Sequence, residues 1–533
     1  MRRSFRWSVA LAFGPIVLVS TAAHAQLTRP ERTAFRETSS YADVMAFLDS
    51  LRIRGAQFRE GIMGLSPEGK PIPYLIVSHP LVSSPAEAAR SGKPVVYIQA
   101  NIHAGEVEGK EAAQMLLRDL TLGALRPLLD SVVILMAPIY NSDGNDHWAP
   151  GEVNRPGQDG PALVGTRANG QGYDLNRDYV KLEAPETRGS LGLWAAWDPD
   201  VFIDLHTTDG SYHGYALTYA PGLNPNSPPA NDYVRDWFLP KIRERVRQRH
   251  HEEMFWYGNF RDQDPDSLTE GWETYDPRPR FGTNLFGMRG RISILSEAYS
   301  NDDLKTRVIS TYDFVHEILS LLAEDRARVK AVVARSDAYH PDSVTVRSVM
   351  APPTMQDVIA ELTRPAGEGG GPYARRTRTG IFKTIRMPVF DRFTAARKEA
   401  LPEAYLLPPQ FSDIVDLLRH QGILVGRLTA PWHGDGESFR LDSVTAVPFV
   451  FEGHRAVTVE GRWAPHPSLE ADAGWYVVST RQPLGVLAAY LLEPASEDGY
   501  VEWNFLDRAL RRGQDYPFFR LRLPIETPRL LVP

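Results

Sequence analysis

The chain has 533 residues and an ordinary globular composition, with 43% hydrophobic and 23% charged residues and a formal net charge of −7. This length is more than one typical domain needs, and an acidic balance without a basic stripe argues against a nucleic-acid partner. The sequence has no cysteine, which excludes disulfides, cysteine nucleophiles and cysteine-held zinc, so any metal must be held by histidine and carboxylate side chains.

The first 25 residues have the pattern of a secretory signal. A basic start precedes an apolar run from Trp7 to about Ser20, and Ala23-His24-Ala25 has the form of a cleavage site. The apolar run is too short for a membrane span, and no later segment reaches ~18 consecutive apolar residues. We therefore expect export to the periplasm or the extracellular space, a mature chain that begins at Gln26, and no membrane span in that mature chain.

Strand-like and helix-like runs alternate from about residue 40 to residue 335. We expect helices at residues 41–51, 106–120, 233–254 and 303–336, and strands at residues 71–79, 93–101, 131–140, 198–207 and 290–299. Such alternation predicts an α/β/α sandwich on a mixed, mostly parallel sheet.

After about residue 337 the pattern changes to recurrent short β-like runs. Examples are residues 443–453, 455–463 and 475–492, with only brief helical patches such as residues 411–420. The predicted organisation is therefore a signal peptide (1–25), an α/β domain (26–336) and a β-rich C-terminal accessory domain (337–533).

A histidine and a glutamate interrupt the passage from a buried strand to an amphipathic helix in "VVYIQANIHAGEVEGKEAAQMLL". His103 and Glu106 lie at the break, and the C-terminal ends of strands are where α/β folds gather functional groups. A second His-x-x-Glu pair, His250 with Glu253, lies in a charge-rich helical run, where we expect a solvated helix face. Position alone leaves a structural role for His103 equally open.

Three further stretches carry polar side chains where strands or turns end. The strand "VFIDLHT" ends at His206, the strand "ISILSEA" delivers Glu297, and the glycine-flanked turn "RANGQGYDLNRDY" carries Asp174, Asn176 and Arg177. Each of these features alone is compatible with a structural role. Their occurrence together, in this order on one α/β unit, indicates a functional site.

A hydrolytic zinc site uses three ligands from neutral histidine and carboxylate groups and keeps one position open. His103, Glu106 and His206 supply such a set. Zinc polarises the substrate carbonyl and lowers the pKa of its bound water toward ~7, but the attack also needs a base that is not a ligand. Glu297 is the candidate for that base.

The ordered motifs "HAGE", "GYDLNRD", "DLHT" and "ILSEAY" resemble those of the carboxypeptidase A/B-like zinc metallocarboxypeptidases, the funnelin type. The resemblance covers roughly residues 40 to 335. It implies a metallopeptidase with one zinc ion per chain, held by His103, Glu106 and His206. It also implies that Glu297 acts as general base toward a zinc-activated water and then as general acid toward the leaving amine.

The resemblance further implies how a substrate is held. Arg177, together with Asn176, would clamp the free C-terminal carboxylate of a peptide through the planar guanidinium. Asp174 would orient a zinc-bound histidine from behind. The partner implied is therefore a peptide with a free C-terminal carboxylate.

Two positions of the family pattern have less definite counterparts. For the arginine that stabilises the oxyanion, Arg167 fits a pattern seen in some branches, and Arg155 stays open as an alternative. For the mobile tyrosine, Tyr275 is the candidate by its spacing before Glu297.

Two other functions are compatible with the fold. One is a zinc amidohydrolase of the aspartoacylase and succinylglutamate desuccinylase type, which shares the His-x-x-Glu and Asp-Leu-His features. The other is a non-catalytic peptide- or glycan-binding protein on the same fold. The expected export and accessory domain disfavour the first, and the presence of Glu297 and all three ligands disfavours the second. The sequence thus predicts an exported zinc carboxypeptidase.

Overall fold

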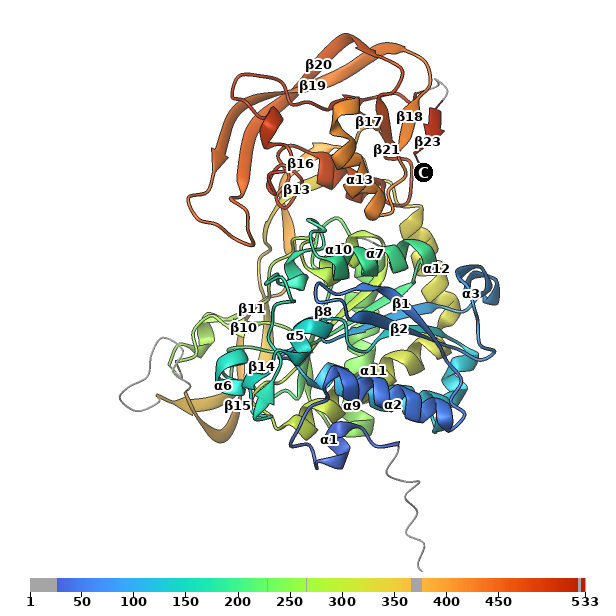
Figure 1. Cartoon of the computed structure of the whole chain (residues 1–533). Coiled ribbons are helices and arrows are strands. Elements are labelled where there is room, and N and C mark those ends of the chain that lie inside the picture. Colours follow the sequence, from blue (N-terminus) through green and yellow to red (C-terminus); the bar gives the residue numbers. More distant parts are fainter. Residues whose placement is uncertain (1–25, 228, 265, 366–375, 526–528, 533) are drawn as a thin grey trace, which may run out of the picture.

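The computed structural model describes residues 26–227, 229–264, 266–365, 376–525 and 529–532, so the predicted signal peptide lies outside the described residues (Figure 1). An eight-stranded sheet forms the centre of the N-terminal part. Its strands follow one another across the sheet in this order: β1 (Arg59–Leu65), β2 (Pro71–Val77), β4 (Val133–Ala137), β3 (Val95–Ala100), β7 (Val201–Thr207), β12 (Ile292–Ala298), β8 (Leu217–Pro221) and β9 (Met254–Trp256).

The sheet is mixed, with a parallel centre. The pairs β4–β3, β3–β7, β7–β12 and β8–β9 are parallel, whereas β1–β2, β2–β4 and β12–β8 are antiparallel. The central strands are buried on both faces, which explains why their sequences are continuous apolar runs and do not alternate.

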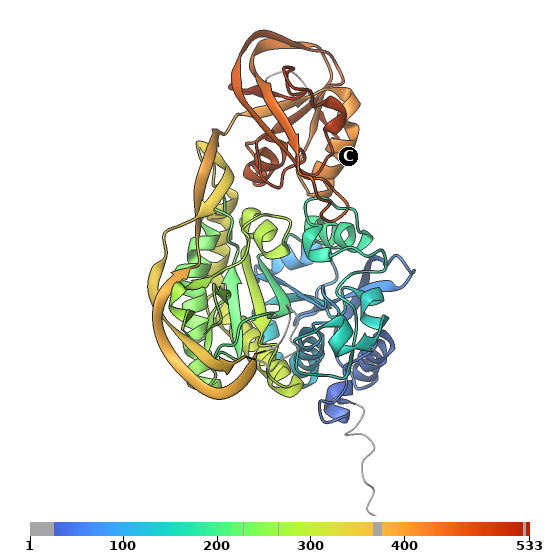
Figure 2. The ribbon, with the colours of Figure 1, turned by 90° about the vertical axis from the view of Figure 1, so that its left-hand side faces the viewer.

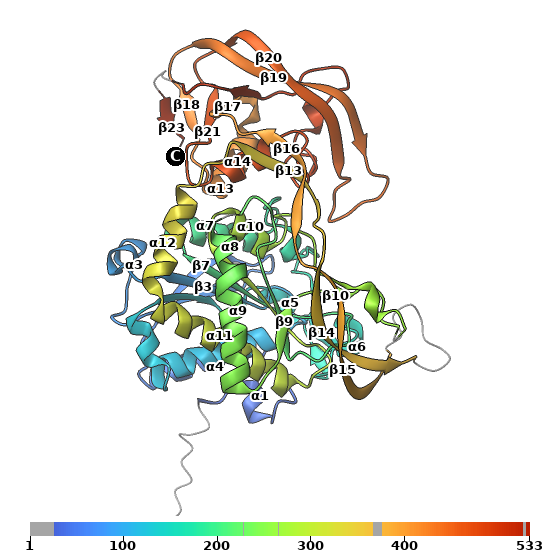
Figure 3. The same cartoon turned by 180° about the vertical axis from the view of Figure 1, so that it is seen from behind.

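Helices cover both faces of this sheet (Figures 1 and 3). One layer holds α2 (Tyr41–Ile53), α4 (Glu108–Leu122), α9 (Leu239–His250) and α11 (Leu304–Glu324), and the other holds α7 (Pro185–Trp197) and α10 (Gly282–Met288). Alternate residues of β3 face opposite cores, since Val96 and Ile98 belong to the apolar cluster of the first layer, and Val95 and Tyr97 to that of the second. The predicted α/β/α sandwich is confirmed.

Two predicted helices are wrong in their extent. The helix expected at residues 233–254 ends at His250, because His251 has a left-handed backbone (φ 61°) and β9 then begins at the sheet edge. The long helix expected at residues 303–336 is divided at Asp325 into α11 and α12 (Arg326–Asp337). Both segments are rich in charged residues with good helix propensity, so their sequences do not indicate where a helix ends.

The C-terminal region is β-rich, as predicted. Its seven-stranded sheet has the order β20 (Val457–Ala471), β19 (Trp432–Ala446), β22 (Phe519–Leu521), β17 (Ala404–Leu407), β21 (Tyr476–Ser479), β18 (Gly426–Leu428) and β23 (Arg529–Leu531), and a separate pair joins β13 (Ser343–Met350) to β16 (Phe393–Ala400). The β-like interpretation of residues 475–492 is wrong in its second half, where α14 (Gly485–Leu492) is a helix. Every residue of α14 is buried, and periodicity cannot separate a wholly buried helix from a buried strand.

The C-terminal region packs on the sandwich through a shared apolar core. Trp194 and Phe286 of the sandwich belong to the same buried cluster as Leu418, Leu487 and Trp503 of the C-terminal region. The α13 helix (Ser412–His420) and α14 lie at this contact (Figure 3). The boundary after residue 336 stays a prediction.

A long hairpin of the C-terminal region also extends along the side of the sandwich (Figure 2). It consists of β14 (Thr354–Arg364) and β15 (Thr377–Phe390), and it forms a four-stranded sheet with β10 (Asn259–Phe260) and β11 (Trp272–Glu273) of the sandwich. Within the described part of the chain, no helix is long and apolar enough to cross a bilayer.

Candidate metal centre and its pocket

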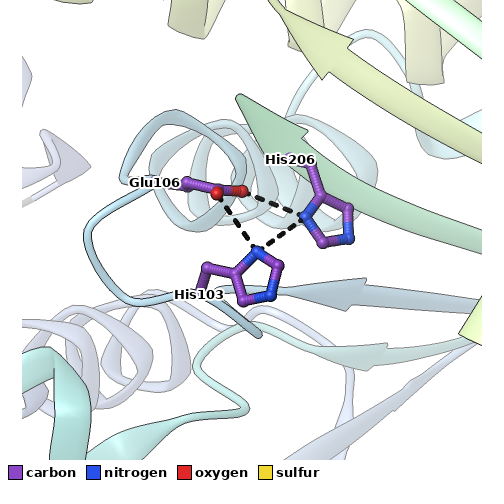
Figure 4. Close-up of side chains that lie close together, drawn as sticks. All are labelled: His103, Glu106 and His206. Atoms are coloured by element: carbon purple, nitrogen blue, oxygen red, sulfur yellow. Dashed lines mark hydrogen bonds and ion pairs between the residues drawn. The ribbon is translucent and has the colours of Figure 1, made fainter. Parts of the chain in front are cut away.

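The two histidines and the glutamate of the predicted ligand set meet at the C-terminal ends of two adjacent parallel strands (Figure 4). After β3 the backbone turns at Asn101, which has a left-handed conformation (φ 69°) and is followed by His103 and Glu106 ahead of α4. Gly109 lets α4 approach β7, because a Cβ atom there would lie 2.6 Å from Cβ of Leu205. This close approach brings Glu106 next to His206, near the end of β7.

The donor atoms of this cluster converge on one point. Nδ1 of His206 lies 3.2 Å from Nδ1 of His103 and 3.0 Å from Oε2 of Glu106, and Nδ1 of His103 lies 3.1 Å from Oε1 of Glu106. Ligands at ~2.0–2.1 Å from a tetrahedral zinc ion are about 3.3 Å apart. The separations and the chemistry of the set, two imidazoles and one carboxylate, therefore fit a zinc ion.

Each imidazole is oriented from behind by an aspartate. Nε2 of His103 lies 3.0 Å from Oδ1 of Asp174, and Nε2 of His206 lies 3.1 Å from Oδ2 of Asp204. A proton kept on Nε2 by a carboxylate leaves the Nδ1 lone pair available for a metal. Asp174 is thus hydrogen-bonded to His103, and its role toward a metal stays a prediction.

Both candidate arginines lie beside Glu106. The Arg167 guanidinium is 3.2 Å from Oε1 of Glu106 and 2.8 Å from Asp174, and that of Arg155 is 3.5 Å from Oε1 of Glu106. Burial alone would raise the pKa of Glu106, but His103 and Arg155 hold it well below its usual range. Glu106 is thus kept as a carboxylate.

The two arginines differ in their availability to a substrate. Arg155 donates from its Nη2 atom to the carbonyls of Thr207 and Thr208, at 2.6 and 2.9 Å, and its side chain is 14% exposed. Arg167 lines the pocket described below, and its side chain is 40% exposed. Only Arg167 therefore presents its charge to the pocket.

Glu297 stands beside the cluster on the neighbouring strand. It pairs with His206 in the parallel register of β12 and β7 and lines the same pocket as the three donors. Burial, together with repulsion from Glu106 and Asp209, raises the pKa of Glu297 well above its usual value, against the opposing effect of His206 and Arg155. Its carboxyl group is close to the donors without being one of them.

The pocket has a volume of about 190 Å³, and Asn176 and Arg177 also line it. Asp174 caps the short 3₁₀-helix η3 (Leu175–Arg177) that holds both residues. The Arg177 guanidinium stacks on Phe281, with 4.1 Å between Cζ and the ring centre, and donates one bond to the carbonyl of Asn176 at 2.8 Å. Its other donors stay available to a ligand in the pocket.

A purely structural role for Arg177 as an ion-pair partner of Asp178 or Glu183 has no support. In the described part of the chain those two acids face Lys181, at 3.7 and 3.5 Å, and the acid within 4 Å of Arg177 is Asp174, at 3.9 Å.

Two tyrosines line the pocket, and only one was predicted. Tyr275 is present, but its hydroxyl donates to Oδ1 of Asn284 at 3.3 Å. Tyr257, which follows β9, packs edge-on against Tyr275 at 5.6 Å, and its hydroxyl has no hydrogen-bond partner among the described residues. No pattern in the sequence indicates Tyr257, because it follows a three-residue edge strand in an irregular segment.

A mixed-sheet α/β/α sandwich that gathers two histidines, a glutamate and a further carboxylate at its strand ends has the site of a metallopeptidase. Residues 44–263 match the family of zinc carboxypeptidases. This match confirms the predicted resemblance for that part of the chain and the predicted class of enzyme, a metallopeptidase.

Similar proteins include Carboxypeptidase 2 of Trichophyton rubrum, which is 25% identical over 483 residues, covering 86% of this chain and 81% of the relative. The match thus extends past the sandwich into the C-terminal region. Carboxypeptidase D of Mus musculus is 29% identical over 131 residues, 22% of this chain and 9% of the relative. Among solved structures, a metallo-carboxypeptidase from Burkholderia cenocepacia matches with a TM-score of 0.40 and 19% identity, covering 54% of this chain and 70% of that one.

Proposed function

We propose that this protein is an exported zinc carboxypeptidase that removes C-terminal residues from peptides. The observation that carries the proposal is the convergence of the donors of His103, Glu106 and His206 at 3.0–3.2 Å, in a pocket that also holds Glu297 and Arg177. These three donors would hold one zinc ion per chain, which when bound supplies a Lewis acid for the scissile carbonyl and acidifies water.

Glu297 is proposed as the proton-transfer group. Its place beside His206, outside the donor set, suits a carboxylate that takes a proton from the attacking water and then gives it to the leaving amine nitrogen. Asp174 would keep His103 in the tautomer that presents Nδ1.

The two arginines of the pocket are proposed to have separate roles. Arg177, with Asn176, would bind the terminal carboxylate of the peptide and so position the last peptide bond over the donor cluster. Arg167 would face the negative charge that develops on the carbonyl oxygen, since Arg155 is already bonded to two backbone carbonyls.

The test compares matched peptides that end in a free carboxylate or in an amide. In the wild type, amidation should reduce kcat/KM strongly, and Arg177→Ala should reduce it about as much on the free peptide. In the variant, amidation should then reduce kcat/KM little further, since both changes remove the same interaction between Arg177 and the terminal carboxylate. Arg188→Ala is a matched control, because Arg188 is exposed and bonds only to the Leu182 carbonyl.

Equal cleavage of free and amidated peptides by the wild type would contradict the carboxypeptidase proposal even with zinc bound. Hydrolysis of N-acyl amino acids without release of C-terminal residues would favour the amidohydrolase alternative. For export, the measurement is the N-terminus of the mature protein, which should be Gln26.

A further inference from the structure

A second cluster of histidines and carboxylates lies between two helices, away from the pocket. His250 ends α9, and Asp313, His316 and Glu317 lie on α11, which packs against α9 (Figure 3). The three α11 residues are spaced i, i+3 and i+4, so they share one helix face. None of the four lines the pocket that holds Glu297.

We propose that His250, His316 and Glu317 bind a second divalent metal ion of the zinc class. One donor atom from each lies within 4.8 Å of the others. Two imidazoles and one carboxylate form the same donor set as in the catalytic cluster and suit zinc, cobalt, nickel or copper more than magnesium or calcium. Glu317 is buried and the two histidines are half-buried, so a small rotation of the imidazole rings would bring the three donors to one metal ion.

The surroundings of His250 match those of a metal-binding imidazole. Its Nε2 atom lies 3.1 Å from Oε1 of Glu317, and its Nδ1 atom lies 3.1 Å from Oδ2 of Asp313. Asp313 thus lies behind the His250 ring at a distance similar to that between Asp174 and His103. Nε2 of His250 and Oε1 of Glu317 thus point to the same place.

His316 supplies an unused donor. It is half-buried, and its ring nitrogens have no hydrogen-bond partner among the described residues. Burial lowers its pKa, so the neutral ring, which is the ligand form, is favoured. A half-buried imidazole without a partner, beside two carboxylates, is better satisfied by a cation than by water alone.

The charge balance of the cluster leaves room for a cation. Glu252, which follows α9, has a buried Oε2 atom without a hydrogen-bond partner in the described part of the chain. Glu252 adds a carboxylate near Asp313 and His250, and a metal ion would offset part of this negative charge.

Two arginine side chains compete with a metal ion for the Glu317 carboxylate but do not exclude it. The Arg249 guanidinium lies 3.0 Å from Oε2 and 3.3 Å from Oε1 of Glu317, and that of Arg245 lies 3.8 Å from Oε2. Arg249 is thus closest to the oxygen that faces away from His250. Glu106 of the catalytic cluster likewise has two guanidinium groups, of Arg155 and Arg167, within 3.5 Å. The competing structure is a metal-free network of ion pairs among the same side chains.

The test uses the full chain with the catalytic donors removed, so it does not depend on the proposed catalytic site. The double variant His103→Ala/His206→Ala, dialysed against zinc and then against buffer, should retain one zinc per chain by elemental analysis. Adding His316→Gln to it should abolish that binding or weaken it at least tenfold. Adding His433→Ala, at an exposed histidine of β19, should leave it unchanged.

Cobalt substitution and thermal unfolding provide a second readout. The double variant should show a cobalt absorption band and a zinc-dependent rise in Tm, and the His316→Gln triple variant should show neither. Matching circular dichroism of the two variants in chelator would establish that both fold. The proposal would be overturned, in favour of the ion-pair network, if the double variant bound no zinc. It would also be overturned if the His316→Gln triple variant kept its zinc.

Discussion

The sandwich and the C-terminal region both bury charged side chains, but they use them differently. At the ends of β3, β7 and β12, the charges of Glu106 and Glu297 face a pocket with room for a ligand. In the C-terminal region, Glu493 and Arg520 are fully buried and satisfy each other directly, with Tyr405 as a further partner. The charges in the sandwich are available to act on a ligand, whereas those in the C-terminal region are paired within the packed interior.

The two regions meet on either side of the pocket. On one side, the β14–β15 hairpin packs Arg378 over Tyr299, two residues after Glu297. On the other, the turn between β19 and β20 reaches the sandwich through Glu452, which accepts from the Asp174 amide at 3.4 Å, and His454, which pairs with Glu183 at 2.9 Å. The C-terminal region thus supports the walls of the site without contributing to the donor cluster.

Removal of residues 337–533 is the most severe way to test this division of roles. The truncation exposes Trp194 and Phe286, which share a buried cluster with the C-terminal region, and loss of such a core contact is worth several kcal/mol per large side chain. We expect residues 26–336 alone to aggregate or to lack a cooperative unfolding transition. Size-exclusion chromatography and circular dichroism measure this. A soluble, fully active fragment would contradict the supporting role.

Glu297→Gln tests the role of the pocket in the sandwich. This single change should remove catalytic activity and leave the fold intact. The amide keeps the shape of the side chain but cannot accept a proton, so kcat should fall about 10² to 10⁴-fold. Zinc content and Tm should remain those of the wild type. Retained turnover would place the base elsewhere.

The sequence predicted the donor cluster because each donor follows a buried strand, and in parallel sheets the ends of adjacent strands lie together. His103 with Glu106, His206 and Glu297 are therefore encoded by local patterns. Asp174, Asn176 and Arg177 were predicted by resemblance to the family. The structure brings all of these residues to one pocket or its edge.

Features that depend on distant pairings were not predictable. The β11–β15 pair joins Trp272 to Val389, and nothing near either residue signals that contact. His454 lies between the β-like runs 443–453 and 455–463, and neither run indicates that the turn between them contacts Glu183. His250 was expected on a solvated helix face, and its partners on α11 are more than sixty residues away in sequence. Such contacts follow from the packing of whole elements and leave no local trace.

Arg280 tests whether buried charges at the interface serve stability alone. It is 5% exposed and donates to Asp498 from its amide at 2.6 Å and from Nε at 2.7 Å. Arg280→Met keeps the amide but leaves the buried Asp498 without its charged partner, which should cost about 3–5 kcal/mol of unfolding free energy. Urea unfolding measures this loss.

The neighbouring Arg278 is the matched control for Arg280. Its side chain is 34% exposed and pairs with Asp276, so Arg278→Met should cost less than about 1 kcal/mol. Equal losses in the two variants would mean that burial does not distinguish the two ion pairs.

The smallest expected effect concerns the contact of His454 with Glu183, and it depends on pH. The hydrogen bond that His454 donates to the Glu183 carboxylate raises the pKa of His454. Burial would raise the pKa of Glu183, but the same bond lowers it. A raised histidine pKa contributes stability that is complete below about pH 6.5 and is lost as pH rises through the folded-state value. A lowered carboxyl pKa contributes stability that is present above about pH 4.5 and is lost on further acidification. The contact should therefore stabilise the fold most between about pH 4.5 and pH 6.5.

Because both side chains are partly exposed, His454→Ala should cost less than about 1 kcal/mol at pH 5.5 and still less at pH 8.5. Urea unfolding at both pH values, with His433→Ala as the control at an exposed position, measures the difference, and a loss that is equal at the two pH values would show that His454 contributes by packing and not by charge.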